Sequence, residues 1–308
     1  MLGDAVELIK TRHGRDIDLE ALDLNNAAVL NRFTKHEFVG IFQYDSTGAH
    51  AACEDIPFTS FEDITALTAL NRPGTMRSGL ATEFKKRKLD PSKIKPFHPL
   101  VDAICSDTLG ILVYQEQVIR IFTEVAGYTP GTADSLRKKI AKKWGDEAIG
   151  REREKFISGA MERGVPEDDA GKLMDNITFF GSYGFNKSHA SAYAAIAYWG
   201  MWLKEHSPHE FLWALMKNEP SRSEIARFAK EAIRLKINVL PPDINSSGVT
   251  FAIDADDNIR SSLADIKNVG KTAIGAVVEN QPFNSVSDLL ARCSGRALNS
   301  RVLDSLIR

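Results

Sequence analysis

The sequence predicts a mainly α fold in which many helices are followed, late in the chain, by a small α/β connector. Apolar residues recur at helical spacing through most of the first 236 residues. Glycine or proline separates the periodic runs, for example at Gly127, Pro130 and Gly164. With 308 residues, of which 43% are hydrophobic and 26% charged, the chain can bury a sizeable core and form about two domains.

The expected helices begin and end at typical capping and turn residues. Thr59 or Ser60 is a typical N-cap, and the Pro-Gly pair at 73–74 ends the helix that follows. Helices are expected over residues 2–30 with a turn at 13–15, and over 60–70, 114–126, 131–144, 147–164, 166–180, 188–205, 208–218 and 221–235.

Other segments depart from helical spacing. Residues 40–44 are apolar and aromatic and are expected to be extended. Residues 84–99 carry six basic residues and three prolines, which predicts an exposed basic loop. Residues 238–253 predict short strands beside turns, and short helices return from Leu263, with a second helical hairpin near Ala297.

Composition and charge exclude several classes of protein. The 39 basic and 41 acidic residues give a net charge of −2, so any nucleic-acid contact must come from local basic clusters. Cys53, Cys105 and Cys293 form no CxxC pair, which argues against a disulfide framework or a cysteine zinc site. No long apolar run predicts a membrane span, and no signal-peptide pattern is present, so a cytoplasmic protein with no membrane contact is expected.

The segment Gly181–His189 predicts an anion site at the start of a helix. Two glycines precede Asn186, Lys187, Ser188 and His189, which bring a cap and hydrogen-bond donors to the positive end of the helix dipole. This combination suits a phosphate. The alternative is an ordinary capped helix with a solvated lysine.

Further charged residues are open to two interpretations. Arg137–Lys139 and the lysines at 142–143 either clamp phosphates or form a solvated helical face. Together with residues 84–99 they indicate charge segregation within a nearly neutral chain. Glu116 lies among apolar neighbours without an acidic partner at helical spacing, which favours a hydrogen-bonding role over a catalytic one. The histidines lack a metal-binding spacing, so no metal site is expected.

The turn Ile266–Lys271 predicts a second phosphate site, where backbone N–H groups meet the ligand at a helix start. Gly270 is expected to make the tight turn, and a bulky residue there is expected to disrupt it. Many helix–turn–helix joints contain Val-Gly, so a purely structural turn is the alternative.

Several motifs occur in one order that resembles a known family. They are Gly40-Ile-Phe-Gln-Tyr-Asp-Ser46, Phe61-Glu-Asp-Ile-Thr-Ala-Leu67, Leu70-Asn-Arg-Pro-Gly74, Tyr114-Gln-Glu-Gln-Val118, Tyr183-Gly-Phe-Asn-Lys-Ser-His189 and Leu240-Pro-Pro-Asp-Ile-Asn245. The ordered set resembles the fingers region of the alpha subunit of bacterial DNA polymerase III, the replicative C-family polymerase. The resemblance covers nearly the whole chain. Asn268 stands where the family usually has a hairpin glycine, and Ala141 replaces the glycine of its Gly-Lys-Lys.

The resemblance implies a helical fingers domain over 1–236, a short-strand connector over 237–262 and a partial helix-hairpin-helix segment over 263–308. It implies a nucleotidyltransferase function during DNA replication, with contacts to the incoming dNTP and the template-primer DNA. The implied phosphate-binding residues are Arg72, Arg137, Lys142, Lys187, Ser188 and His189, and the implied DNA-binding residues are Val269, Gly270 and Lys271.

The resemblance also implies what lies outside this chain. The family's palm domain, with the aspartates that bind Mg²⁺, precedes the region matched here, so the isolated chain is expected to bind no catalytic metal and to be inactive. A palm-containing polymerase segment or chain is the expected partner, and the sliding clamp is expected to bind only through missing regions. A fragment of a longer polymerase and a split polymerase remain open, as do a non-catalytic helical DNA-binding protein and a degenerate remnant.

Overall fold

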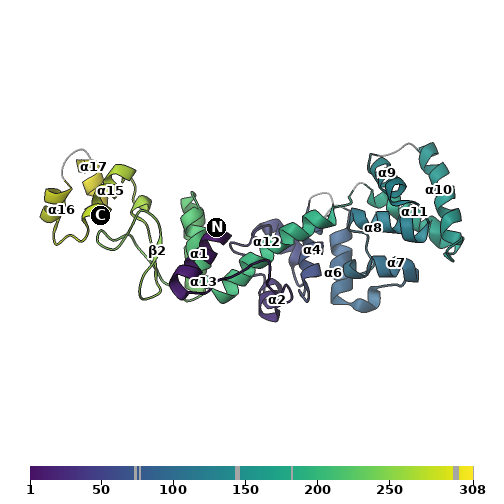
Figure 1. Cartoon of the computed structure of the whole chain (residues 1–308), viewed down its shortest axis with the longest axis horizontal. Helices are drawn as coiled ribbons and strands as arrows, with labels where there is room; N and C mark the ends of the chain where they lie inside the picture. The colour runs from purple at the N-terminus through teal and green to yellow at the C-terminus, as the bar shows by residue number, and fades with distance from the viewer. Residues whose placement is uncertain (73–74, 76–77, 143–145, 182, 294–297, 308) are drawn as a thin grey trace. The chain divides into compact units, whose positions relative to one another are not determined.

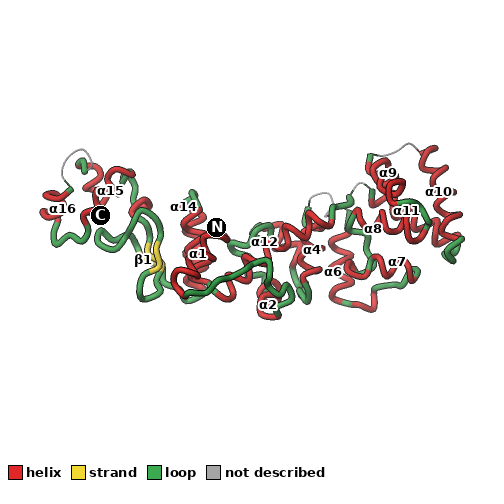
Figure 2. The backbone as a smooth tube through the Cα atoms, in the orientation of Figure 1, coloured by secondary structure: helices red, strands yellow, loops and turns green. Residues whose placement is uncertain are grey.

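The computed structural model describes residues 1–72, 75, 78–142, 146–181, 183–293 and 298–307. The chain is mainly helical with three short strands among the described residues, which confirms the predicted fold class (Figures 1 and 2). It divides into two compact units: unit 1 comprises residues 1–22 and 199–308, and unit 2 comprises residues 23–198. The domain division inferred from the sequence stays a prediction.

Unit 2 is built from helices. In chain order it holds α2 (Ala27–Thr34), α3 (Thr47–Cys53), α4 (Phe61–Leu70), α6 (Leu80–Leu89), α7 (Pro99–Ile104), α8 (Gln115–Arg120), a π-helix (Ile121–Val125), α9 (Pro130–Ala141), α10 (Asp146–Met161), α11 (Glu167–Phe180) and the first part of α12 (Lys187–His206). Two 3₁₀ turns, Pro91–Lys93 and Ser106–Thr108, lie on either side of α7. The apolar faces of α7 to α11 and of the π-helix share one core, in which Phe122 and Phe156 are fully buried.

Most helix boundaries follow the local signals in the sequence. Ser60 forms a capping box with Asp63 at the start of α4, as the acidic first turn predicts. Thr129 caps α9 by accepting the N–H of Thr132, and Pro130 occupies the first helical position. The expected helices therefore match the observed ones closely from residue 114 to residue 234.

One expected irregular segment is wrong in part, and another is wrong throughout. Residues 84–89 of the predicted basic loop belong to α6, because Phe84 is buried and two lysines find partners: Lys88 donates to the buried Asp63 carboxylate at 2.7 Å, and Lys85 to Asp55 at 3.3 Å. Residues 40–44 form turns rather than an extended piece. Gln43 adopts a positive φ of 65° in these turns, which bends the chain.

Unit 1 carries the strands. It holds α1 (Leu2–His13), the rest of α12, α13 (Pro208–Asn218), α14 (Arg222–Arg234), β1 (Val239–Leu240), β2 (Ala252–Ile253), β3 (Ile259–Arg260), a 3₁₀ turn (Leu263–Asp265), α15 (Lys271–Asn280), α16 (Val286–Arg292) and α17 (Ser300–Ile307). The strand order is β1-β3-β2, with β1 parallel and β2 antiparallel to β3. The sequence predicted the first two strands but not the third.

The C-terminal helices of unit 1 pack around their own apolar cluster, which includes Val269, Ile274, Leu289 and Val302. Ala297, where a second hairpin was expected to begin, lies outside the described residues. Helices α15 to α17 all lie within residues 263–308, the segment predicted to contain the helix-hairpin-helix.

Candidate phosphate-binding sites

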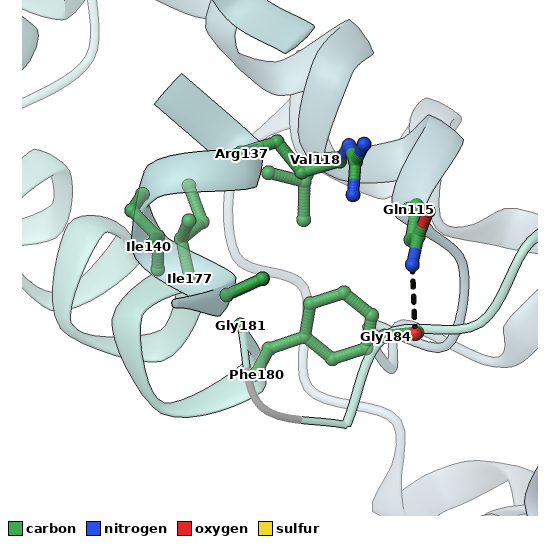
Figure 3. A pocket seen from close by; sticks show the side chains of 9 residues that line it. Gln115, Val118, Arg137, Ile140, Ile177, Phe180, Gly181 and Gly184 are labelled. Atoms are coloured by element: carbon green, nitrogen blue, oxygen red, sulfur yellow. Dashed lines mark hydrogen bonds between the residues drawn. The ribbon is translucent and has the colours of Figure 1, made fainter. Parts of the chain in front are cut away.

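Backbone hydrogen bonds join the segment that leads into α12 to the segment that leads into α8, although the two are far apart in the sequence. Tyr114 and Phe185 form a parallel β-bridge. The Gln115 N–H donates to the Phe185 carbonyl at 2.8 Å, and the Phe185 N–H donates to the Val113 carbonyl at 3.2 Å. The Gln115 side chain also donates to the Gly184 carbonyl at 3.0 Å (Figure 3). Two of the motifs singled out in the sequence therefore form one site.

Glu116 occupies the N-terminus of α12. Its carboxylate accepts the Asn186 side-chain amide at 2.8 Å and the Lys187 N–H at 2.9 Å. Asn186 in turn caps the helix by accepting the His189 N–H at 2.8 Å. These contacts confirm the hydrogen-bonding role expected for Glu116. They also mean that an internal carboxylate already lies at the helix start that the sequence predicted for an external anion.

The Lys187 side chain has an internal partner as well. Its ammonium donates to the Asp107 carboxylate at 3.0 Å and lies 5.4 Å from the centre of the Tyr114 ring. Burial raises the pKa of the Tyr114 phenol, so this ring stays neutral beneath the lysine. The lysine and aspartate side chains are 41% and 49% exposed, so their ion pair is weak and open to solvent. Sequence reasoning missed Asp107, because no local pattern links it to a helix that begins 80 residues later.

Arg72 differs from Lys187 in its partners. Its guanidinium donates to the carbonyl oxygens of Ala69 and Tyr183 at 3.1 and 3.2 Å and lies 4.0 Å from the centre of the Phe185 ring. Within the described part of the chain, no carboxylate contacts it. Burial lowers the pKa of the Arg72 guanidinium, which records a partly desolvated cation without a counter-charge. Such a group gains free energy from an incoming anion.

The other predicted phosphate-binding residues lie in or near this helix start and differ in their exposure and partners. Arg137 donates to Asp134 at 2.9 and 3.0 Å and lines a small recess with Gly181 and Gly184 (Figure 3). Ser188 and His189 are exposed in the first turn of α12.

The end of α9 approaches the same segment. Lys142 is exposed at its C-cap, whereas Lys143 lies outside the described residues. A Cβ on Gly181 would lie 2.5 Å from a methyl group of Ile140, so this close approach requires glycine. The structure thus places the end of α9, which carries Arg137, against Gly181, the first residue of the segment Gly181–His189.

A different arrangement surrounds the start of α15. Asn268 adopts a positive φ of 70°, and its side chain donates to the Ser305 hydroxyl at 3.2 Å. Val269 is buried, and its N–H donates to the Ile266 carbonyl at 3.3 Å. Gly270 and Lys271 are exposed, and the first intrahelical bond runs from Ile274 to Gly270, so the N–H groups before Ile274 lack intrahelical acceptors.

The expectation that Gly270 makes the tight turn is wrong. Its φ is −92°, which any residue adopts, and a Cβ added there meets no atom within 4 Å. Asn268 is the residue in the left-handed region, which asparagine tolerates better than most residues. Lys267, also exposed, places a second ammonium group in the same turn, and sequence reasoning left it out of the site.

The described residues contain no group of three or more His, Cys, Asp or Glu side chains that could hold a metal ion. In the part of the chain that the structure describes, every helix is too short or too polar to cross a membrane.

Comparisons with known proteins agree with the motifs. The family model for the bacterial DNA polymerase III alpha subunit finger domain matches residues 1–164, and a helix-hairpin-helix motif model matches residues 236–308. The DNA polymerase III subunit alpha of Aquifex aeolicus is 38% identical over 306 residues, which are 98% of this chain and 26% of that protein. Those of Thermus aquaticus and Escherichia coli are 37% and 34% identical, over 100% and 98% of this chain and 26% and 27% of their own lengths. These matches confirm the resemblance, and the chain spans about a quarter of the length of these relatives.

Proposed function

Because the chain belongs to the finger-domain family of the bacterial DNA polymerase III alpha subunit, we propose that it is the fingers portion of a DNA-directed DNA polymerase. In this role it holds the phosphates of the incoming dNTP and the adjacent template-primer DNA during replication. Mg²⁺, which stabilises the charge that develops in phosphoryl transfer, is held by a palm-containing segment or chain and not by the described residues. The isolated chain is therefore inactive.

The observation that carries this proposal is the environment of Arg72. The guanidinium is partly buried and stacked on Phe185, and among the described residues its acceptors are carbonyl oxygens alone. A planar cation held in this way is suited to a phosphate, which it can contact with two parallel N–H groups.

Lys187, Ser188 and His189 complete the proposed phosphate site. The exposed ion pair between Lys187 and Asp107 is worth about 0–1 kcal/mol at most, so a triphosphate can replace the aspartate at little cost. Ser188 adds a hydroxyl at the positive end of the helix dipole. Arg137 and Lys142 extend the cationic surface from the end of α9.

The start of α15 supports a separate contact with the DNA backbone. Gly270 leaves room for a phosphate, and the N–H groups of Gly270 and Lys271 face it, while Val269 anchors the turn in the core. Contacts of this kind bind without selecting a base sequence. The match to the helix-hairpin-helix motif over these residues supports this assignment.

The test is the substitution Arg72→Gln in the complete polymerase that contains this chain. The efficiency of dNTP incorporation, kcat/KM, is expected to fall by about 10- to 150-fold, because a charge-assisted contact contributes roughly 1.5–3 kcal/mol. Arg72→Lys is expected to give a smaller loss, since the charge remains but the planar donor pair does not.

Arg153→Gln is the matched control, because Arg153 is an exposed arginine of the same unit that pairs with Asp175 at 3.1 Å. Its kcat/KM is expected to change by less than about twofold. Equal losses in the two glutamine variants would contradict the proposed role of Arg72.

A further inference from the structure

A row of four aromatic rings continues from Arg72 along the start of α12. Phe185, His189 and Tyr193 are spaced four residues apart, and neighbouring ring centres are 5.3 and 4.2 Å apart. Phe42 joins the other end, with its ring centre 5.2 Å from that of Tyr193. These four rings are called the aromatic row, and the Arg72 guanidinium covers the Phe185 ring at one end of it.

Two rings of the aromatic row are exposed to solvent, and the other two, Phe185 and Tyr193, are half-buried. Phe42 is 42% exposed, and His189 is exposed as well, whereas most other phenylalanines of unit 2 are buried. The turn at 40–44 holds Phe42 outward, because Ile41 and Tyr44 on either side of it are anchored in the core. The Tyr44 hydroxyl donates to the Ile64 carbonyl at 2.7 Å, which fixes the turn.

The chemistry of this surface matches an unpaired nucleobase better than a protein side chain. Aromatic rings in series offer faces and edges on which bases stack regardless of sequence, at about 1–3 kcal/mol per base. The row ends at Arg72, a cation without a carboxylate partner among the described residues, and Lys187 lies in the same first turn of α12 as His189. A polyanion with flat bases satisfies both features at once, because its phosphates pair with the cations while its bases cover the rings.

We propose that the aromatic row is a stacking platform for unpaired bases of single-stranded DNA, with Arg72 contacting the backbone at one end. This inference rests on the proposed function, since it adds single-stranded DNA to the ligands of the same helix start. Phe42 belongs to the Gly40–Ser46 motif and Tyr193 follows the Tyr183–His189 motif, and neither is part of the proposed phosphate site.

The experiment measures binding of the 308-residue chain to a fluorescein-labelled oligothymidylate of sixteen nucleotides by anisotropy, at one salt concentration and without dNTP. An abasic strand of the same length is the probe for the backbone alone. The unsubstituted chain is expected to bind oligothymidylate more tightly than the abasic strand. Phe42→Leu and Tyr193→Leu are each expected to weaken oligothymidylate binding by about 5- to 150-fold and to leave abasic binding unchanged.

Two further variants separate stacking from other causes. Phe42→Trp keeps an aromatic face and is expected to retain binding, whereas Phe42→Leu keeps only the apolar surface. Phe179→Ala removes another phenylalanine of unit 2, 57% exposed and outside the row, and is expected to have no effect.

Three results would overturn the proposal: equal binding of the two probes by the unsubstituted chain, full binding by Phe42→Leu, or equal losses in Phe42→Leu and Phe179→Ala. Full binding by Phe42→Leu would mean that base stacking on the Phe42 ring does not contribute to DNA binding. These failures are distinguishable from failure of the proposed function, because the Arg72→Gln test measures kcat/KM for dNTP in the complete polymerase.

Discussion

The helices α12 and α15 both begin with a lysine, but the two helix starts differ in what already occupies them. At α12, the Lys187 N–H donates to Glu116 and the Lys187 ammonium donates to Asp107. At α15, Lys271 is exposed, and no carboxylate contacts it within the described residues. A helix start can therefore bind an external anion at once only where the chain has not supplied its own.

In the proposed function, this difference suits the two sites to different ligands. The start of α12 would bind phosphate by exchange, which favours a ligand with several charges, such as a triphosphate, over a single phosphate. The start of α15 would need no exchange and would contact DNA phosphates weakly. The following predictions test this difference.

The largest effect is expected for Lys187→Ala in the complete polymerase. Loss of a charge-assisted contact predicts a fall in kcat/KM for dNTP of about 10- to 150-fold, while the free energy of unfolding changes by less than about 0.5 kcal/mol. Lys172→Ala is the matched control, because Lys172 also pairs with a surface aspartate at 3.0 Å. If both lysine variants incorporate dNTP like the unsubstituted enzyme, Lys187 is only a solvated lysine.

Glu116→Ala is expected to destabilise the chain by about 1–3 kcal/mol. The substitution leaves the Asn186 amide and the Lys187 N–H without their acceptor. Chemical denaturation of the 308-residue chain measures this change. Glu124→Ala removes a surface pair with Arg120 and is expected to cost less than about 0.5 kcal/mol. A loss for Glu116→Ala no larger than that for Glu124→Ala would mean that the carboxylate does not hold the helix start.

Asn268→Val is expected to cost about 1–2 kcal/mol, because a β-branched residue resists the positive φ of this turn. Asn268→Gly is expected to leave the free energy of unfolding unchanged within about 0.5 kcal/mol.

Gly270→Ala is also expected to leave the free energy of unfolding unchanged but to weaken DNA binding, since its Cβ fills the space proposed for a phosphate. A large stability loss for Gly270→Ala would restore the idea that this glycine makes the turn.

Lys271→Ala is expected to act on the salt dependence of duplex DNA binding. Each lysine–phosphate contact contributes about 0.9 to the slope of log affinity against log salt, so the slope of the complete polymerase is expected to fall by about one unit. The fall is expected to be the same on unrelated duplex sequences. An unaltered slope, or a marked preference for one sequence, would argue against a backbone contact.

The helices could be predicted from the sequence because their signals are local. Ser60, Pro130 and the apolar spacing from 114 to 234 each specify an element from neighbouring residues. The end of α6 was predicted to be part of a loop because the carboxylates that pair with its lysines come from other segments. Asp55 and Asp63 neutralise these lysines, so the segment can pack as a helix.

The contents of the candidate sites were harder to predict for the same reason. The motif at the start of α12 predicts a helix start with donors, but nothing near it shows that Glu116 and Asp107, 70 and 80 residues earlier, fill it. At α15, the Val-Gly pair predicted that Gly270 makes the turn, whereas the residue with a positive φ is Asn268. Partners brought together by folding leave no trace in local sequence.

The exchange at Lys187 is tested most directly by a double-substitution cycle that measures KM for dNTP in the complete polymerase. Asp107→Asn is expected to lower KM by up to about fivefold, because the nucleotide no longer displaces a paired carboxylate worth about 0–1 kcal/mol. In the Lys187→Gln background the same Asp107→Asn substitution is expected to leave KM unchanged. An equal effect of Asp107→Asn in both backgrounds, or none in either, would contradict the account that the aspartate holds the lysine until nucleotide replaces it.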